Sequence, residues 1–221
     1  MSVRPYLIAL GLLAVGCTDT VGPPSGQSPP LTEALHLLRW AGKMAPHFSA
    51  SGARLGTGAF QGAAADGISL SQNTVTFWAV RGQERSVQIN YQSGSDTTCP
   101  FLRLTVSDPT YVPGVGDLAP GDSVLISMTV DPQTISVSFE PTGLLFGTPS
   151  PMQLWYGGAG GDLSGDGVVD STDVYIESQL LGMVYRELPT DQWAKISTTQ
   201  SLADKSFTTG LQHFSQYAVS F

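Results

Sequence analysis

A twelve-residue segment rich in Asp and Gly is the strongest candidate for chemistry in this chain. Counted from Asp162, oxygen-bearing side chains stand at positions 1, 3, 5, 9 and 12. Position 6 is Gly167, which tolerates the positive φ of a sharp turn. Position 7 needs only a backbone carbonyl. Calcium binds six to eight oxygens in a loop of this layout, so the spacing predicts one structural Ca²⁺ ion. The predicted ligands are Asp162, Ser164, Asp166, the Val168 carbonyl, Asp170 and Asp173.

This segment resembles the EF-hand loop, and more closely its dockerin variant, in which the last ligand is Asp. The shorter Asp173 side chain implies weaker binding than a Glu would give, and one loop is present where dockerins carry two. The loop pattern also implies that Val169 faces inward. The residues after Asp173, up to Leu181, fit a short helix and could also extend as a strand; we expect the helix. The alternative for the whole segment is an Asp- and Gly-rich turn without metal.

The N-terminus carries the signs of export. Arg4 precedes an apolar run from Tyr6 to Val15, which is too short to cross a bilayer and has the length of a signal-peptide core. The run ends in Leu13-Ala14-Val15-Gly16-Cys17, which resembles the lipobox of bacterial lipoproteins. The resemblance implies that residues 1–16 are removed and that Cys17 carries the lipid. An ordinary signal peptide is the alternative.

A Pro- and Gly-rich spacer, residues 17–30, follows the lipobox and is expected to act as a tether. If Cys17 is lipidated, Cys99 has no cysteine to pair with, and we expect it to be a small buried or loop residue. Two or three acyl chains would hold the protein at the membrane. The predicted location is therefore the bacterial cell envelope, at the outer membrane or the periplasmic face.

The body of the chain is predicted to be all-β. Leu31–Met44 has apolar residues at helical spacing and predicts one short N-terminal helix, and a Gly- and Ala-rich linker is expected over Ser49–Gly67. From Thr74 onward, short stretches of period two alternate with Pro, Gly and Asp turns, which is typical of an antiparallel sandwich or barrel. The expected strands are Thr74–Val80, Ser86–Tyr91, Phe101–Val106, Ser123–Val130, Ile135–Phe139, Met152–Tyr156, Val184–Leu188, Trp193–Ile196, Phe207–Leu211 and Tyr217–Phe221.

Two motifs in this body resemble a known family. Phe139-Glu140-Pro141-Thr142-Gly143-Leu144-Leu145-Phe146 and the closing His213-Phe214-Ser215-Gln216-Tyr217-Ala218-Val219 are similar to segments of the β-sandwich domain named for zonula occludens proteins and netrin receptors. The resemblance implies an immunoglobulin-like sandwich over residues 68–221, interrupted by an insert at 157–181. It also implies a structural and interaction module.

Composition narrows the class of function. The net charge of −8 disfavours a nucleic-acid surface, which needs clustered Lys and Arg. The three His residues, His36, His47 and His213, have no zinc spacing, and no phosphate loop or nucleophile motif is present. His213 is expected to be a structural residue of the last strand. Trp78, Trp155 and Trp193 fall at strand positions and are expected in the core.

The sequence therefore predicts a non-catalytic, calcium-binding envelope protein, tethered to the membrane, whose sandwich meets an envelope protein or a polysaccharide. A carbohydrate-binding module of the envelope is the first alternative, and exposed, coplanar aromatic side chains would support it. An envelope hydrolase is the second, and would need paired acids in one cleft.

Overall fold

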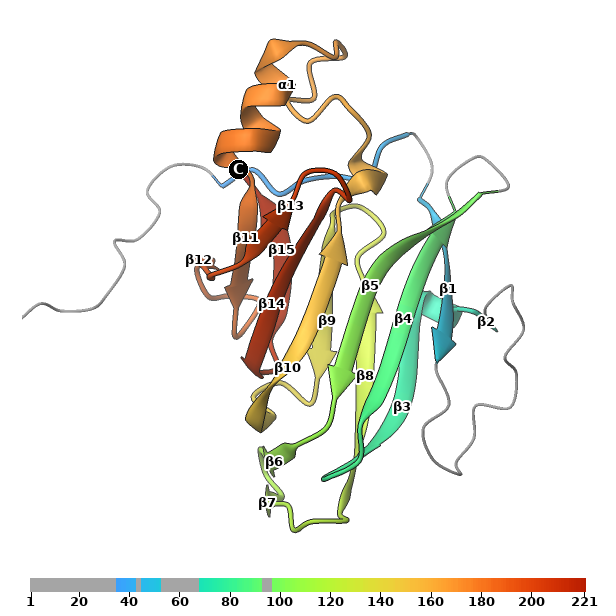
Figure 1. The fold of residues 1–221 in the computed structure, drawn as a ribbon, viewed down its shortest axis with the longest axis vertical. Helices are drawn as coiled ribbons and strands as arrows, with labels where there is room; N and C mark the ends of the chain where they lie inside the picture. Colours follow the sequence, from blue (N-terminus) through green and yellow to red (C-terminus); the bar gives the residue numbers. More distant parts are fainter. Residues whose placement is uncertain (1–34, 43–44, 53–67, 93–96) are drawn as a thin grey trace, which may run out of the picture.

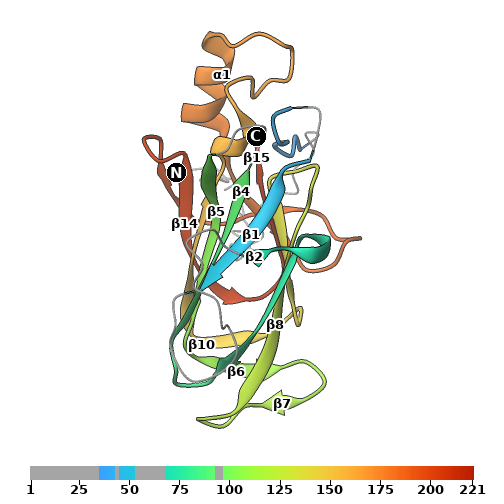
Figure 2. The same ribbon diagram turned by 90° about the vertical axis from the view of Figure 1, so that its right-hand side faces the viewer.

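The computed structural model describes residues 35–42, 45–52, 68–92 and 97–221. These residues form two antiparallel sheets of nine and six strands, packed as the layers of a sandwich (Figures 1 and 2). The nine-stranded sheet contains β1 (His47–Gly52), β2 (Ile68–Ser69), β4 (Arg85–Gln92), β5 (Thr98–Val106), β6 (Pro109–Val112), β7 (Gly116–Asp117), β10 (Leu145–Trp155), β13 (Thr199–Ser201) and β14 (Ser206–His213). The six-stranded sheet contains β3 (Thr74–Val80), β8 (Ser123–Val130), β9 (Ser136–Glu140), β11 (Gly182–Arg186), β12 (Ala194–Lys195) and β15 (Gln216–Ser220). The predicted all-β sandwich is confirmed.

Period-two alternation explains how the strands build the core. In β3, Val75, Phe77 and Ala79 are buried, while the residues between them face outward. β8 pairs with β3 along its whole length and buries every second residue in the same way. Successive side chains of a strand point to opposite faces, so each sheet contributes one apolar face to a shared core.

The two family-like motifs pack against each other. The Phe139 ring stacks on Phe214 with 4.9 Å between centroids, and Phe146 meets Phe214 edge-on at 5.0 Å. The Gly143 amide donates to the Phe214 carbonyl at 2.8 Å, and Gly143 has φ of +77°. A side chain is strained at that φ, so the glycine suits the turn that brings the motifs together.

The predicted helix over Leu31–Met44 is wrong for the part that the structure describes. Residues 36–40 are extended, and their amides and carbonyls bond to other segments. Leu38 donates to the Val219 carbonyl at 2.9 Å and accepts from the Ile135 amide at 2.7 Å. Leu38 and Trp40 are buried while Arg39 is exposed, which is a period of two. Tertiary hydrogen bonding and burial override the local helical spacing.

The predicted Gly- and Ala-rich linker begins later than expected. Its start, Ser49–Gly52, belongs to β1, which pairs with β4 and buries Phe48 and Ala50. Residues 53–67 lie outside the described residues, as do the signal peptide, Cys17 and the tether.

A helical lobe projects from one end of the sandwich, opposite the β6–β7 end (Figures 1 and 2). It contains the short turn η2 (Gly157–Ala159), the helix α1 (Ser171–Tyr175) and a π-helical turn η3 (Ile176–Leu180); a further turn, η1 (Ser71–Asn73), lies before β3. The helix expected after Asp173 is confirmed. None of the described helices has both the length and the apolar character that a bilayer crossing requires.

Candidate functional site

The candidate loop lies in the insert between β10 and β11. Leu163, Ile176 and Leu181 are buried and attach the insert to the end of the sandwich. Gln200 reinforces the attachment, because its amide nitrogen donates to the Tyr156 hydroxyl at 3.1 Å and to the Glu177 carbonyl at 2.9 Å. The insert therefore shares the core of the sandwich and is not a separate unit.

Asp173, the predicted last calcium ligand, is buried and forms hydrogen bonds with backbone amides at both ends of the loop. It is only 3% exposed. Its Oδ1 accepts from the amides of Leu163 at 2.8 Å and Ser164 at 2.9 Å, and its Oδ2 accepts from the Asp170 amide at 2.9 Å. Asp170 caps helix α1 by accepting from the Thr172 amide at 2.7 Å. One carboxylate thus joins the start of the loop to the start of the helix.

The pKa of Asp173 is lowered from its ordinary value, mainly by the hydrogen bond from the Asp170 amide and then by that from the Ser164 amide. Backbone donors stabilise the ionised form of a carboxyl group. Asp173 is therefore ionised at neutral pH and held by amide donors.

The carboxylate of Asp162 folds the first half of the loop. Its Oδ1 accepts from the Gly165 amide at 2.8 Å, and its Oδ2 accepts from the Gly167 amide at 2.9 Å. Asp166 makes a smaller turn by accepting from the Val168 amide at 2.8 Å. Gly167 has φ of +89°, as its loop position predicts.

The carboxylates of the loop are not gathered into a recognisable metal centre. Within the described part of the chain, no three His, Cys, Asp or Glu side chains gather where they could hold a metal. Both oxygens of Asp173 accept hydrogen bonds from amides of the loop. Calcium therefore stays a prediction of the sequence.

Val169 departs from the loop pattern, because it is exposed rather than turned inward. It lies in a run of apolar side chains that the insert presents to solvent. Their exposed fractions are 57% for Val168, 70% for Val169, 65% for Val174, 56% for Tyr175 and 43% for Leu180. Sequence periodicity did not predict this group, because the exposure of these side chains depends on the tertiary structure. The sandwich leaves most of the insert uncovered.

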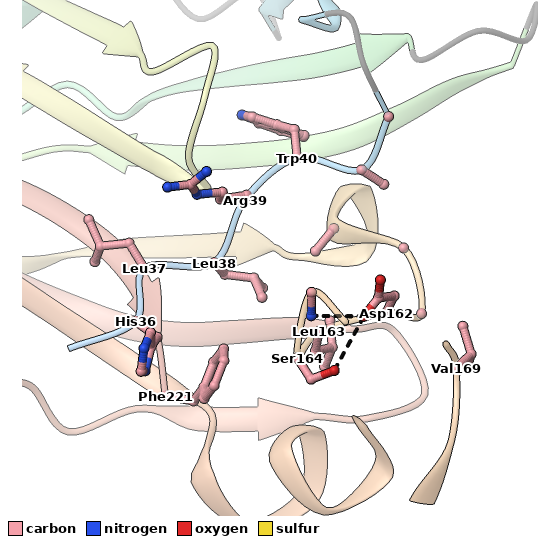
Figure 3. Close-up of a pocket in the computed structure, with 16 residues that line it drawn as sticks. His36, Leu37, Leu38, Arg39, Trp40, Asp162, Leu163, Ser164, Val169 and Phe221 are labelled. Atoms are coloured by element: carbon pink, nitrogen blue, oxygen red, sulfur yellow. Dashed lines mark hydrogen bonds between the residues drawn. The ribbon is translucent and has the colours of Figure 1, made fainter. Parts of the chain in front are cut away.

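A cleft of about 660 Å³ separates the insert from the extended segment 36–42 (Figure 3). Trp40 and Leu38 line it from one side, and Asp162 and Ser164 line it from the other. His36 stacks on Phe221 with 5.3 Å between ring centroids at its edge. Asp162 is the one carboxylate among the described residues that line this cleft.

The three tryptophans that were expected in the core do not lie there, and Trp193 precedes β12 instead of belonging to a strand. Trp78 is 54% exposed on β3, and Trp155 and Trp193 are half-buried. Trp155 and Trp78 belong to different sheets, so they do not form one coplanar platform. The tryptophan of the core is Trp40, which packs on Phe101 with 5.0 Å between centroids.

His213 ends β14 rather than lying in the last strand. Its carbonyl accepts from the Tyr217 hydroxyl at 2.8 Å, and its Nδ1 lies 3.4 Å from Glu187 Oε1. Burial raises the pKa of Tyr217 to about 12, so the hydroxyl remains a donor. Cys99 is a half-buried free thiol in β5.

Comparison with known proteins gives no relative: no family model, curated protein or solved structure matches this chain.

Proposed function

We propose that this chain is a non-catalytic, membrane-tethered protein of the bacterial envelope, whose immunoglobulin-like sandwich is a structural or interaction module. The observation that carries the proposal is the group of exposed apolar side chains on the insert, Val168, Val169, Val174, Tyr175 and Leu180. All five belong to the same short insert, and contiguous exposed apolar patches mark interaction sites. We call this group the insert patch.

The hydrogen bonds of Asp162 and Asp173 favour binding by the insert patch. They fix the loop that carries Val168 and Val169 before any partner arrives. A surface that is ordered in advance loses less conformational entropy on association. The insert is thus suited to present apolar side chains to a protein partner.

Several acids of the sandwich have structural roles, which supports a binding module over a hydrolase. Asp108 pairs with Arg81 at 3.0 Å, and Asp122 and Asp191 accept amide hydrogen bonds that close turns. A glycoside hydrolase would need two carboxyl groups about 5 to 9.5 Å apart across one site. The cleft beside the insert offers Asp162 alone among its described lining residues.

Membrane tethering is tested by fractionation of cells that express the full chain. The wild-type protein is expected in the membrane fraction with an acylated Cys17 at its N-terminus, as determined by mass spectrometry. Cys17→Ala should move the protein to the soluble fraction, because the anchor is lost. Cys99→Ala is the matched control and should stay with the membrane. An unmodified N-terminus at another residue would overturn the tether.

The insert patch is tested by photo-crosslinking in cells. A photoreactive residue in place of Tyr175 should give a discrete adduct with a protein of the envelope, and Val169→Asp should abolish it by placing a charge in the patch. The same photoreactive residue in place of Trp78, which is similarly exposed on the sandwich, should not give that adduct. Equal adducts from both positions would show that the patch has no special role.

A further inference from the structure

The outer face of the nine-stranded sheet carries a continuous row of polar side chains. The row crosses β13, β14, β10, β5, β4 and β1, and each member is the register partner of the next. Figure 1 shows five of these strands, β14, β10, β5, β4 and β1, side by side. Neighbouring strands are about 4.8 Å apart, so the row is about 24 Å long. Its members are Thr199, Thr208, Gln153, Arg103, Gln88 and Ser51.

Hydrogen bonds hold the centre of the row in place. Arg103 donates to Gln88 Oε1 from Nε at 3.1 Å and from Nη2 at 2.6 Å, and Gln88 Nε2 donates to Asn90 Oδ1 at 2.7 Å. Beside it, Gln153 Nε2 donates to Ser206 Oγ at 3.2 Å. The amide groups are therefore oriented without a ligand.

The network leaves some hydrogen-bond donors and some hydrogen-bond acceptors unused. Within the described part of the chain, Asn90 Nδ2 and Gln153 Oε1 have no hydrogen-bond partner. The hydroxyls of Thr199 and Thr208 are also without one there, and both residues are exposed. A hydroxyl-bearing ligand can donate and accept at the same time, which matches this mixture.

Trp155 adds an aromatic surface next to the row. Trp155 follows Gln153 by two residues in β10, so both side chains are on the same face of the sheet, and Trp155 is half-buried. The Arg103 guanidinium lies over its ring, 5.8 Å from the centroid. The part of the Trp155 ring that Arg103 leaves exposed can pack on the C–H groups of a ligand, while the ligand hydroxyls meet the row.

The charge of this face excludes other classes of partner. The six strands that carry the row contain no Asp or Glu, although the chain has 18 such residues. Their cationic residues are Arg85 and Arg103, with no Lys. The face therefore offers no attraction for a cationic partner, and lacks the clustered cations that a polyanion requires.

From this arrangement we propose that the outer face of the nine-stranded sheet binds a neutral polysaccharide chain along the row, with Trp155 packing on a sugar ring. The proposal rests on the interaction role of the sandwich given above, and it assigns that role a second surface, apart from the insert patch. Gln88, Gln153 and Arg103 contact sugar hydroxyls, and the length of the row accommodates several sugar units.

The test is affinity electrophoresis of the full-length protein in detergent. Native gels contain a soluble neutral β-glucan, xylan, mannan or dextran, and parallel gels contain a carboxylated or sulfated polysaccharide. At least one neutral polysaccharide should slow the wild-type protein. Trp155→Ala and Gln153→Ala should each weaken that binding about tenfold or more, as expected for central contacts of a binding site.

Trp78→Ala is the matched control, because Trp78 faces outward on the other sheet; its binding should equal that of the wild type. Thermal unfolding of each variant confirms folding, and Gln153→Ala removes a surface side chain if Trp155→Ala is unstable. The proposal is overturned if no neutral polysaccharide slows the protein, if only the charged polysaccharides do, or if Trp78→Ala loses as much binding as Trp155→Ala. These outcomes are separate from the fractionation and crosslinking results, which involve no polysaccharide.

Discussion

Asp173 shows why ligand spacing alone does not determine what a carboxylate binds. A calcium ion and a set of backbone amides both satisfy an ionised carboxylate, and both use residues at the same separations along the chain. The sequence correctly places oxygen-bearing side chains around one turn. That Asp173 meets the amides of Leu163, Ser164 and Asp170 depends on the path of the backbone, which the spacing does not specify.

Replacing Asp173 with Asn should lower the midpoint of thermal unfolding at neutral pH. An amide group has one acceptor oxygen, and its NH₂ group would face one of the backbone donors that the carboxylate now satisfies. Because the pKa of Asp173 is lowered in the folded state, its stabilising effect is present above the ordinary value of 3.8 and is lost as the pH falls through the folded pKa.

The difference in midpoint between wild type and Asp173→Asn should therefore be largest at neutral pH and shrink toward zero in acid below that ordinary value. Asp117→Asn, at an exposed position in β7, is the control and should leave the midpoint nearly unchanged. A difference that persists unchanged through the acid range would mean that ionisation of Asp173 contributes nothing.

Calcium is a second prediction at the residue scale. Ligand spacing predicts that Ca²⁺ raises the unfolding midpoint more than Mg²⁺, which prefers a tighter octahedron. Because a single loop that ends in Asp173 lacks the bidentate Glu, we expect the rise between about micromolar and millimolar calcium. It should be absent in Asp166→Ala. Identical melting in millimolar calcium and in chelator would show that the loop is a turn that binds no metal.

At the scale of elements, strands with strict alternation were predictable and segments defined by their neighbours were not. Thr74–Val80 and Ser123–Val130 were predicted with their observed bounds, since Val, Ile and Phe alternate with polar residues there. The first half of β10 was missed because Gly147, Pro149 and Pro151 interrupt the pattern near a register shift.

The segment 35–42 was misassigned for a related reason. Leucines at positions that suit a helix also suit an extended chain when only every second residue is buried. Leu38 and Trp40 are in the core because residues 133–135 and 219–221 offer amides and carbonyls at the end of the sandwich. Those partners are about 100 and 180 residues away in sequence, beyond the reach of local periodicity.

Gly158→Ala tests the packing of this segment. A Cβ at residue 158 would clash with the buried Trp40 ring and lie 3.2 Å from the Tyr91 ring. Overpacking of this kind costs about 1–3 kcal/mol, so the free energy of unfolding by urea should fall by that amount. Gly182→Ala is the matched control, because a Cβ there meets no atom within 4 Å. A stability equal to wild type for Gly158→Ala would show that Trp40 is loosely packed.

At the scale of the whole molecule, one core joins two sheets, and the insert adds a lobe of lower expected stability. The strands β4, β5 and β10 lie inside the nine-stranded sheet, paired on both sides. The insert is attached chiefly by Leu163, Ile176 and Leu181, while its loop and the outer side of α1 are exposed. Segments with few buried contacts open without global unfolding.

Hydrogen exchange should therefore separate the molecule into two levels of protection. Amides of β4, β5 and β10 should exchange at the rate of global unfolding, whereas those of residues 163–173 should exchange faster through local opening. Asp173→Asn should accelerate exchange of the Leu163, Ser164 and Asp170 amides, which lose their carboxylate partner, and leave the three strands unchanged. If the variant accelerates the strands to the same extent, the insert and the sandwich unfold together, and the lobe is an integral part of the cooperative unit.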